Sequence, residues 1–244
     1  MRYDTYIFSR KEIFIYCLEY LAIDITIAFL FYDSVWAGLI LLPGIYIFFK
    51  YKKTTLKKKR EDILKTEFIQ TIASFSTAIA SGFSSENALK EAKNDIDRMF
   101  EGSYMSAELG YMIGRIGLGV RIESVLFDFA DRTGIREIRD FATVFAIAKK
   151  NGAAFGSSII RCVNIMEEAK DTEREIEVLL SGKKYEQKIM TLIPVVLIAY
   201  LRYSSPDFIA VWYHNLMGIV VMTVCLGAYM GSAVLTGRIM DIRC

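Results

Sequence analysis

The chain has 244 residues, of which 53% are hydrophobic and 24% are charged, and its formal net charge is +2. A positive mean hydropathy of +0.31 is unusual for a soluble globule, and so many apolar residues exclude a disordered chain. The small net charge excludes a strongly basic nucleic-acid-binding domain. Four widely spaced cysteines and a single histidine provide no disulfide framework or zinc site. We therefore expect apolar and charged segments to alternate along the chain, as in a membrane protein with a polar domain.

Two apolar stretches near the N-terminus predict a hairpin of membrane-spanning helices over residues 1–51. Ile13–Phe31 contains only Glu19 and Asp24 as charged residues, and Val35–Phe49 contains none. Both stretches approach the roughly 20 residues that cross a bilayer as a helix. A cleaved signal peptide is the alternative, but the two stretches follow each other without a small-residue cleavage site between them.

Two further apolar stretches, Ile189–Tyr203 and Leu216–Leu235, predict a second membrane hairpin over residues 187–244. Basic residues precede the first and third stretches and follow the second and fourth, most densely between Lys50 and Arg60. Because such residues stay in the cytoplasm, we expect a multi-pass protein of the plasma (inner) membrane with both termini and residues 52–186 inside. A solvated linker or a nucleic-acid patch is the other interpretation of this lysine run, but its position against an apolar stretch favours topology.

Residues 52–186 have the pattern of a cytoplasmic helical bundle. Apolar residues recur at spacings of three and four from Leu64 to Ile79 and again from Ile138 to Ala148, and alternation over four or more residues is absent. We therefore predict an all-α fold with a bundle of about six helices. The last of these begins near Gly156, and it can continue toward the third span because no proline or strong turn signal occurs before Ser181–Gly182.

The middle of the chain contains a weak internal repeat. Gly82–Leu89 and Gly119–Leu126 both have glutamate four residues after the glycine and leucine seven residues after it, whereas Gly152–Ile159 is a poorer copy with Gly156 in place of the glutamate. Each copy fits a helix that ends at a left-handed glycine, followed by the start of another helix. We therefore expect positive φ at Gly82, Gly119 and Gly152, and capping of the next helix by Ser84.

The order of several short motifs resembles the type II secretion system F domain family, the inner-membrane platform proteins of secretion systems, type IV pili and tight-adherence pili. Two spans, one helical cytoplasmic domain and two more spans match the tight-adherence branch best. Members with two cytoplasmic domains differ from this chain, so a complete platform would require a homo-oligomer or a paralogous partner. The similar segments are Ile79–Gly82, Glu86–Leu89, Gly119–Ala130, Ala148–Gly152, Phe155–Ile160, Ile193–Pro194 and Ser205–Pro206.

The resemblance implies a non-enzymatic scaffold, in which the cytoplasmic bundle meets a hexameric secretion ATPase and the membrane part meets pilin or pseudopilin subunits. Motifs for other chemistry fail: Gly114–Gly119 follows no strand and has the wrong glycine order, and Ser181–Lys183 lacks the glycine that a phosphate loop needs at Glu177. We expect no catalytic residue, no cofactor, no metal site and no nucleic-acid partner.

Charged residues of the repeat region and of the last acidic helix are the candidate partner contacts. The two acids of the first span, Glu19 and Asp24, either contact neighbouring spans and tyrosines or meet a charged group of a partner, such as a pilin N-terminal amine. Intramembrane acids also permit an alternative function as a small transporter or channel subunit. The candidate partner contacts are Glu86, Lys90, Arg121, Glu123, Glu173 and Glu177.

Overall fold

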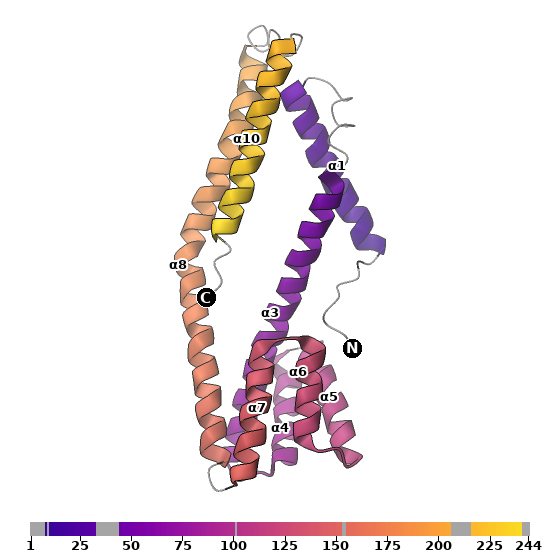
Figure 1. Cartoon of the computed structure of the whole chain (residues 1–244), viewed down its shortest axis with the longest axis vertical. Helices are drawn as coiled ribbons and strands as arrows, with labels where there is room; N and C mark the ends of the chain where they lie inside the picture. Colours follow the sequence, from indigo (N-terminus) through magenta and orange to yellow (C-terminus); the bar gives the residue numbers. More distant parts are fainter. Residues whose placement is uncertain are drawn as a thin grey trace. The chain divides into compact units, whose positions relative to one another are not determined.

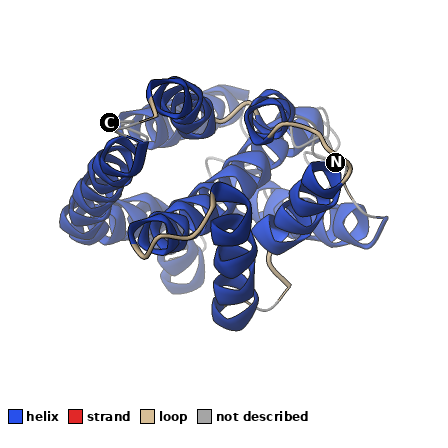
Figure 2. Cartoon of the chain, turned by 90° about the horizontal axis from the view of Figure 1, so that it is seen from below, coloured by secondary structure: helices blue, strands red, loops and turns tan. Residues whose placement is uncertain are grey.

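A computed structural model describes residues 8, 10–32, 44–100, 102–152, 155–205 and 216–240. Within these ranges the chain is entirely helical, as expected, with eight α-helices and no strand (Figures 1 and 2). The predicted hairpin turns at Asp33 and Pro206, and the single histidine, His214, lie outside the described residues. The helices are α1 (Arg10–Tyr32), α3 (Gly44–Ala80), α4 (Ser85–Met99), α5 (Tyr104–Gly117), α6 (Ile122–Thr133), α7 (Arg136–Asn151), α8 (Phe155–Ser204) and α10 (Leu216–Met240).

The helices form two compact units, which we describe separately. The bundle unit is Lys53–Thr172, and the apolar-helix unit comprises the described residues of Phe8–Lys52 and Glu173–Cys244. Helices α3 and α8 contribute residues to both units, so α8 does continue without a break into the predicted third span. The assignment of 1–51, 52–186 and 187–244 to membrane and cytoplasm stays a prediction.

The core of the bundle unit forms around the part of α3 between Leu64 and Ala78. The ring of Phe68 lies 5.6 Å from that of Phe141, between ring centroids, and the ring of Phe75 lies 6.0 Å from that of Phe145. Both predicted apolar stripes are buried in this core, except that Ile79 is only partly buried. Burying each of these phenylalanines stabilises the fold by roughly 1.5–3 kcal/mol, so the spacing of apolar residues explains why α3 is covered by α4–α7.

A buried carboxylate on α3 holds the beginning of α5. Glu67 accepts a hydrogen bond from the Ser103 hydroxyl at 2.9 Å and another from the backbone N–H of Met105 at 3.0 Å. Ser103 also caps α5 by accepting from the N–H of Ser106 at 3.1 Å. A negative charge at a helix N-terminus is favourable because the first N–H groups have no helical acceptor. Glu67 therefore sets the position of α5 against α3.

A largely buried ion pair joins α5 to α6. The guanidinium of Arg132 donates two hydrogen bonds to the carboxylate of Glu108, at 3.0 and 2.7 Å, and a third to Asp128 at 3.0 Å. Only 5% of the Glu108 side chain is exposed. The hydrogen bonds to Glu108 raise the pKa of Arg132, so the guanidinium remains charged at any ordinary pH. Such a forked pair aligns two helices because it has only one good geometry.

We predict that Glu108→Gln lowers the free energy of unfolding by about 3 kcal/mol, because Arg132 then keeps its charge but loses its buried carboxylate partner and retains only the more exposed Asp128. Asp140→Asn is the matched control, since Asp140 faces Arg136 at 4.0 Å in an exposed pair. The control should change stability by no more than about 0.5 kcal/mol. Urea unfolding of the purified chain, followed by circular dichroism, measures both. Equal losses in the two variants would contradict the role of the buried pair.

In the apolar-helix unit, the end of α1 packs against α8 and α10. Leu30, Phe31 and Leu226 form a small buried cluster, and the Tyr32 hydroxyl lies 3.0 Å from the hydroxyl of Thr223. Arg202 of α8 also contacts the end of α1, where it donates to the backbone carbonyl of Phe29 and lies over the Phe29 ring. A cation is favourable there because the last carbonyls of a helix lack helical donors.

Pro194 lies inside α8, where it removes one backbone donor and crowds the preceding turn. The adjoining helix donates to a different carbonyl of that turn. The Tyr229 hydroxyl of α10 donates to the backbone carbonyl of Thr191 at 2.8 Å, three residues before the proline. Apolar surroundings make such a donor valuable, because a carbonyl there has few alternative partners.

The structure supports fewer membrane spans than the four that the sequence predicted. In the described part of the chain, only α1 is both long and apolar enough to cross a membrane, and helices of this kind near an N-terminus also occur in signal sequences. Helix α10 contains a shorter apolar segment, Met217–Ser232. The predicted second span, Val35–Phe49, lies largely outside the described residues, and the predicted third span is a short apolar run at the end of α8.

Candidate interaction surface

Three helix–helix junctions lie at one end of the bundle unit, which we call the junction end: residues 81–84, residues 118–121 and Gly152. The alternating direction of successive helices brings them there (Figure 1). Contacts between elements agree with this placement. The Lys149 ammonium near the end of α7 pairs at 3.4 Å with Glu123 at the start of α6, and Gly156 at the start of α8 lies against Ile79 near the end of α3.

The first two junctions have the same backbone hydrogen bonds. At the first, the N–H of Phe83 donates to the carbonyl of Ala78 and the N–H of Gly82 to that of Ile79, at 3.1 and 3.0 Å. At the second, Val120 donates to Arg115 and Gly119 to Ile116, at 3.2 and 2.9 Å. This pair of bonds is the Schellman motif, which requires a left-handed residue. The two better copies of the sequence repeat therefore encode one structural motif.

The third junction differs from the other two. Positive φ is confirmed at all three glycines, with φ of 88° at Gly82, 84° at Gly119 and 60° at Gly152. However, the N–H of Gly152 donates to the carbonyl of Ala148, four residues earlier, and the N–H of Phe155 donates to Gly152. The poorer third copy is thus a different turn. Gly102 and Gly134, at the junctions α4–α5 and α6–α7, also have positive φ, although they lie outside the repeat.

Exposed apolar side chains and exposed charged side chains surround the first two junctions. Leu118 is 86% exposed, and Phe83 is about half exposed. The predicted contact residues Glu86 and Lys90 are exposed on α4, where the Ser84 hydroxyl accepts from the N–H of Asn87 at 3.4 Å and so caps the helix as expected. This combination of apolar and charged groups is typical of protein–protein contact surfaces.

Glu123 is engaged within the bundle unit. Only 12% of its side chain is exposed, and its carboxylate lies 3.3 Å from Arg121 and 3.4 Å from Lys149. Burial raises the pKa of Glu123, but the hydrogen bonds from its own backbone and from Arg121, with the charge of Lys149, outweigh this and lower it. The structure therefore pairs two of the candidate contact residues, Arg121 and Glu123, with each other, and it leaves mainly Arg121 exposed to a partner.

The remaining predicted residues lie in the apolar-helix unit. Glu173 is partly exposed and has an intramolecular interaction, and Glu177 is exposed, both on α8. Glu19 is bound by the ammonium of Lys52, with 3.1 and 3.0 Å to its two carboxylate oxygens. Asp24 is buried in α1. Lys52 was not among the partners considered from the sequence, because the two residues are 33 positions apart.

The described residues offer no geometry for small-molecule chemistry. A cavity of about 20 Å³ within the bundle core is lined by apolar side chains and by Thr71, and it has room for a water molecule or two. No group of three or more potential metal ligands is found among these residues. The glycine-rich segment Gly114–Gly119 forms the end of α5 and the second junction, and Ser181–Lys183 lies within α8.

Comparisons with protein-family models, with curated proteins and with solved structures find no match for this sequence.

We predict that Gly119→Ala destabilises the bundle unit by about 1–2 kcal/mol, because a Cβ is unfavourable at positive φ even where space is open. Gly114→Ala is the control, because Gly114 lies in the interior of α5 and also has open space around it. There alanine should be neutral or should stabilise by up to about 1 kcal/mol. Thermal unfolding measures the change in stability of each variant, which should be a loss for Gly119→Ala and zero or a gain for Gly114→Ala. A loss of stability in Gly114→Ala equal to that in Gly119→Ala would rule out the left-handed turn as the cause.

Acid should weaken the contact between α6 and α7. Because the folded-state pKa of Glu123 is lowered, its ion pairs stabilise the fold above the ordinary value of 4.5, and this contribution is lost as the pH falls through the lowered pKa. Lys149→Met should therefore reduce the loss of stability between neutral and acidic pH. Lys150→Met changes the net charge equally at an exposed neighbour and should leave that loss as it is. Urea unfolding at several pH values compares the two, and matching pH profiles would exclude the Glu123–Lys149 pair.

Proposed function

We propose that this chain is a non-enzymatic platform protein of the plasma (inner) membrane, which couples a cytoplasmic secretion ATPase to pilin or pseudopilin subunits in a pilus-assembly or type II-like secretion machine. The observation that carries the proposal is the pairing of a charged helical bundle unit with helices whose large apolar side chains point outward. The resemblance to the type II secretion system F domain family supports it, because two of the similar motifs form the same Schellman turn at the junction end.

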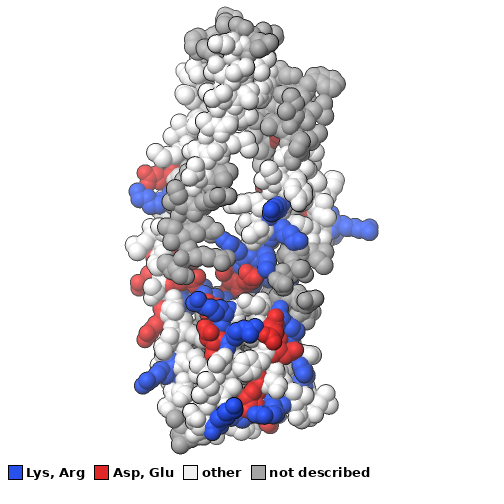
Figure 3. Space-filling model, viewed as in Figure 1, with Lys and Arg blue, Asp and Glu red and all other residues white. Residues whose placement is uncertain are grey.

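The exposed side chains of α1, α8 and α10 support a membrane location. Phe14 and Leu18 on α1, Val196 on α8 and Val224 on α10 are all more than half exposed. Soluble proteins rarely leave such apolar surfaces open to water. Figure 3 shows Lys and Arg interspersed with Asp and Glu over the bundle unit. The visible face of α8 and α10 is nearly uncharged near the top of the view, where α8 ends and α10 begins.

Tyrosines and basic residues at the limits of the apolar part of α8 support the same location. Tyr185 and Lys188 lie before the run that begins at Ile189, and Arg202 and Tyr203 lie at its end. Tyrosine, lysine and arginine are enriched where helices leave the hydrocarbon layer. We propose four spans, including the predicted second span and the end of α8, with both termini in the cytoplasm.

The junction end is the proposed contact with the ATPase. Its exposed residues include Phe83, Glu86, Lys90, Leu118 and Arg121. The apolar-helix unit is the proposed contact with pilin or pseudopilin, and a second copy or a paralogous protein would complete the platform. No step of this role requires a bound nucleotide or a catalytic group in this chain.

A charge swap at the junction end tests the proposed function. In the host, the tagged full-length chain should co-purify with the secretion ATPase from cross-linked membranes. Glu86→Lys combined with Lys90→Glu keeps the net charge and should reduce the recovered ATPase at least tenfold. The control, Arg136→Asp combined with Asp140→Arg, alters an exposed pair at the start of α7 and should leave recovery unchanged. Recovery of the ATPase with both variants would reject the junction end, and its absence with the unmodified chain would reject the function.

A further inference from the structure

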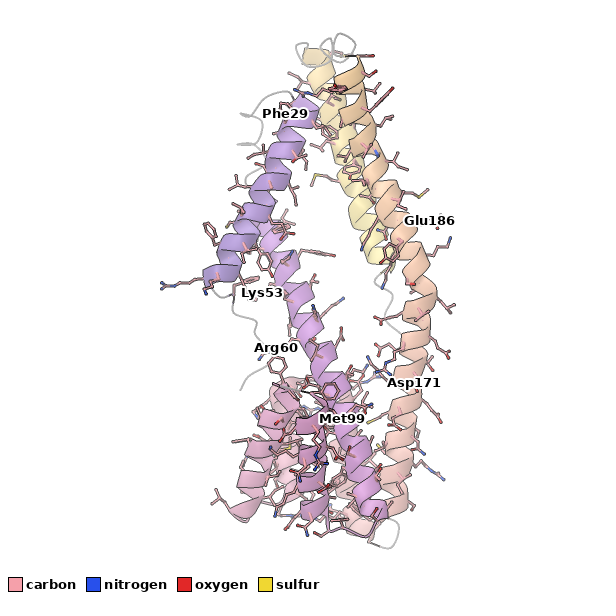
Figure 4. All side chains as sticks on the ribbon, turned by 180° about the vertical axis from the view of Figure 1, so that it is seen from behind. Phe29, Lys53, Arg60, Met99, Asp171 and Glu186 are labelled. Atoms are coloured by element: carbon pink, nitrogen blue, oxygen red, sulfur yellow. The ribbon has the colours of Figure 1, made fainter. Side chains whose placement is uncertain are left out.

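We propose that Lys53 and Lys59, in the basic segment of α3 (Lys53–Arg60), bind the headgroups of anionic phospholipids. This inference rests on the proposed membrane location, but not on the proposed ATPase or pilin partners. It concerns one continuous helix, along which Figure 4 labels Lys53 and Arg60.

The order of side chains along α3 matches the passage from hydrocarbon to water. Tyr46 and Ile47 are 76% and 71% exposed, Tyr51 is 71% exposed, and the basic segment follows at once. With a rise of 1.5 Å per residue, Lys53 lies about 3 Å beyond Tyr51 along the helix, and Lys59 about 12 Å beyond it. The headgroup layer is about 5–8 Å thick, and long lysine side chains extend toward it. Exposed tyrosines mark the level at which this layer begins.

Other basic residues of this region are already occupied within the molecule. Lys52 lies 3.0 Å from Glu19 and 4.6 Å from the ring centroid of Tyr16. Lys57 pairs with Glu61 at 3.6 Å, and the guanidinium of Arg60 lies over the ring of Tyr104. Lys52 therefore joins α3 to α1 and is not available to a lipid.

Lys53 and Lys59 remain exposed to the surroundings. In the described part of the chain neither has an acidic partner, and the sequence contains no Asp or Glu between Tyr51 and Arg60. Lys53, next to the exposed Tyr51, and Lys59, about two turns further along α3, complement phosphate groups that carry a net negative charge. A zwitterionic headgroup offers no such net charge, so we infer selectivity for anionic lipids.

The test uses the full-length chain, purified in a neutral detergent and titrated with mixed micelles that contain phosphatidylglycerol or phosphatidylcholine. Binding is followed by thermophoresis. Wild-type protein should bind phosphatidylglycerol at least tenfold more tightly than phosphatidylcholine, and less tightly as salt is raised from low to high concentration. Lys53→Gln combined with Lys59→Gln should lose tenfold or more of that affinity, since each lysine near an anionic surface contributes about fivefold.

The control variant combines Lys90→Gln with Lys150→Gln, which removes the same charge from exposed lysines elsewhere in the bundle unit. It should bind phosphatidylglycerol like the wild type. Equal affinity in the Lys53/Lys59 variant, equal affinity for the two lipids, or equal binding of water-soluble glycerol phosphate would overturn the inference. Release of the chain from host membranes by alkaline carbonate would overturn it together with the proposed function. Loss of ATPase recovery alone would reject the function and leave the lipid site standing.

Discussion

The apolar stripe of α3 is the constraint on which the bundle unit depends. A helix with phenylalanines at positions 68 and 75 on one face cannot remain in water without a cover, and α6 and α7 provide it with Phe129, Phe141 and Phe145. The same face carries Glu67, whose buried carboxylate binds the first turn of α5. The apolar stripe of α3 therefore requires the helices that cover it, and Glu67 beside it positions one of them, α5. The glycine junctions reverse the chain direction so that successive helices pack against α3.

Local features of this fold were predictable because they depend on neighbours in the sequence. Periodicity identified the buried residues from Leu64 to Phe75, and the glycine–glutamate–leucine spacing identified the turns at Gly82 and Gly119. The pairs Glu108–Arg132 and Glu67–Ser103 were not predictable, since they join residues 24 and 36 positions apart. Glu123 shows the same limit: its place in a first turn was evident, but its burial depends on Lys149 from the end of α7.

In the apolar-helix unit too, the sequence identified the charged residues but not their distant partners. Glu19 stood out in the sequence as an acid in an apolar stretch, and the sequence left open whether it contacts neighbouring helices or a partner. In the structure it has a partner within the chain, Lys52, which reaches it across the rings of Tyr16 and Phe48. Arg202 of α8 donates to a backbone carbonyl at the end of α1. Helix ends compete for cations, and sequence spacing does not reveal the outcome.

The hydrogen bond from Tyr229 to the turn before Pro194 restricts how α8 and α10 can move. Sliding one helix past the other by a single turn would carry the hydroxyl about 5.4 Å from its carbonyl and break this hydrogen bond. This hydrogen bond consequently favours one register between the two helices. Rotation of the two helices about this contact keeps the hydrogen bond, whereas movement of α8 along its own axis keeps it only if α10 moves as well.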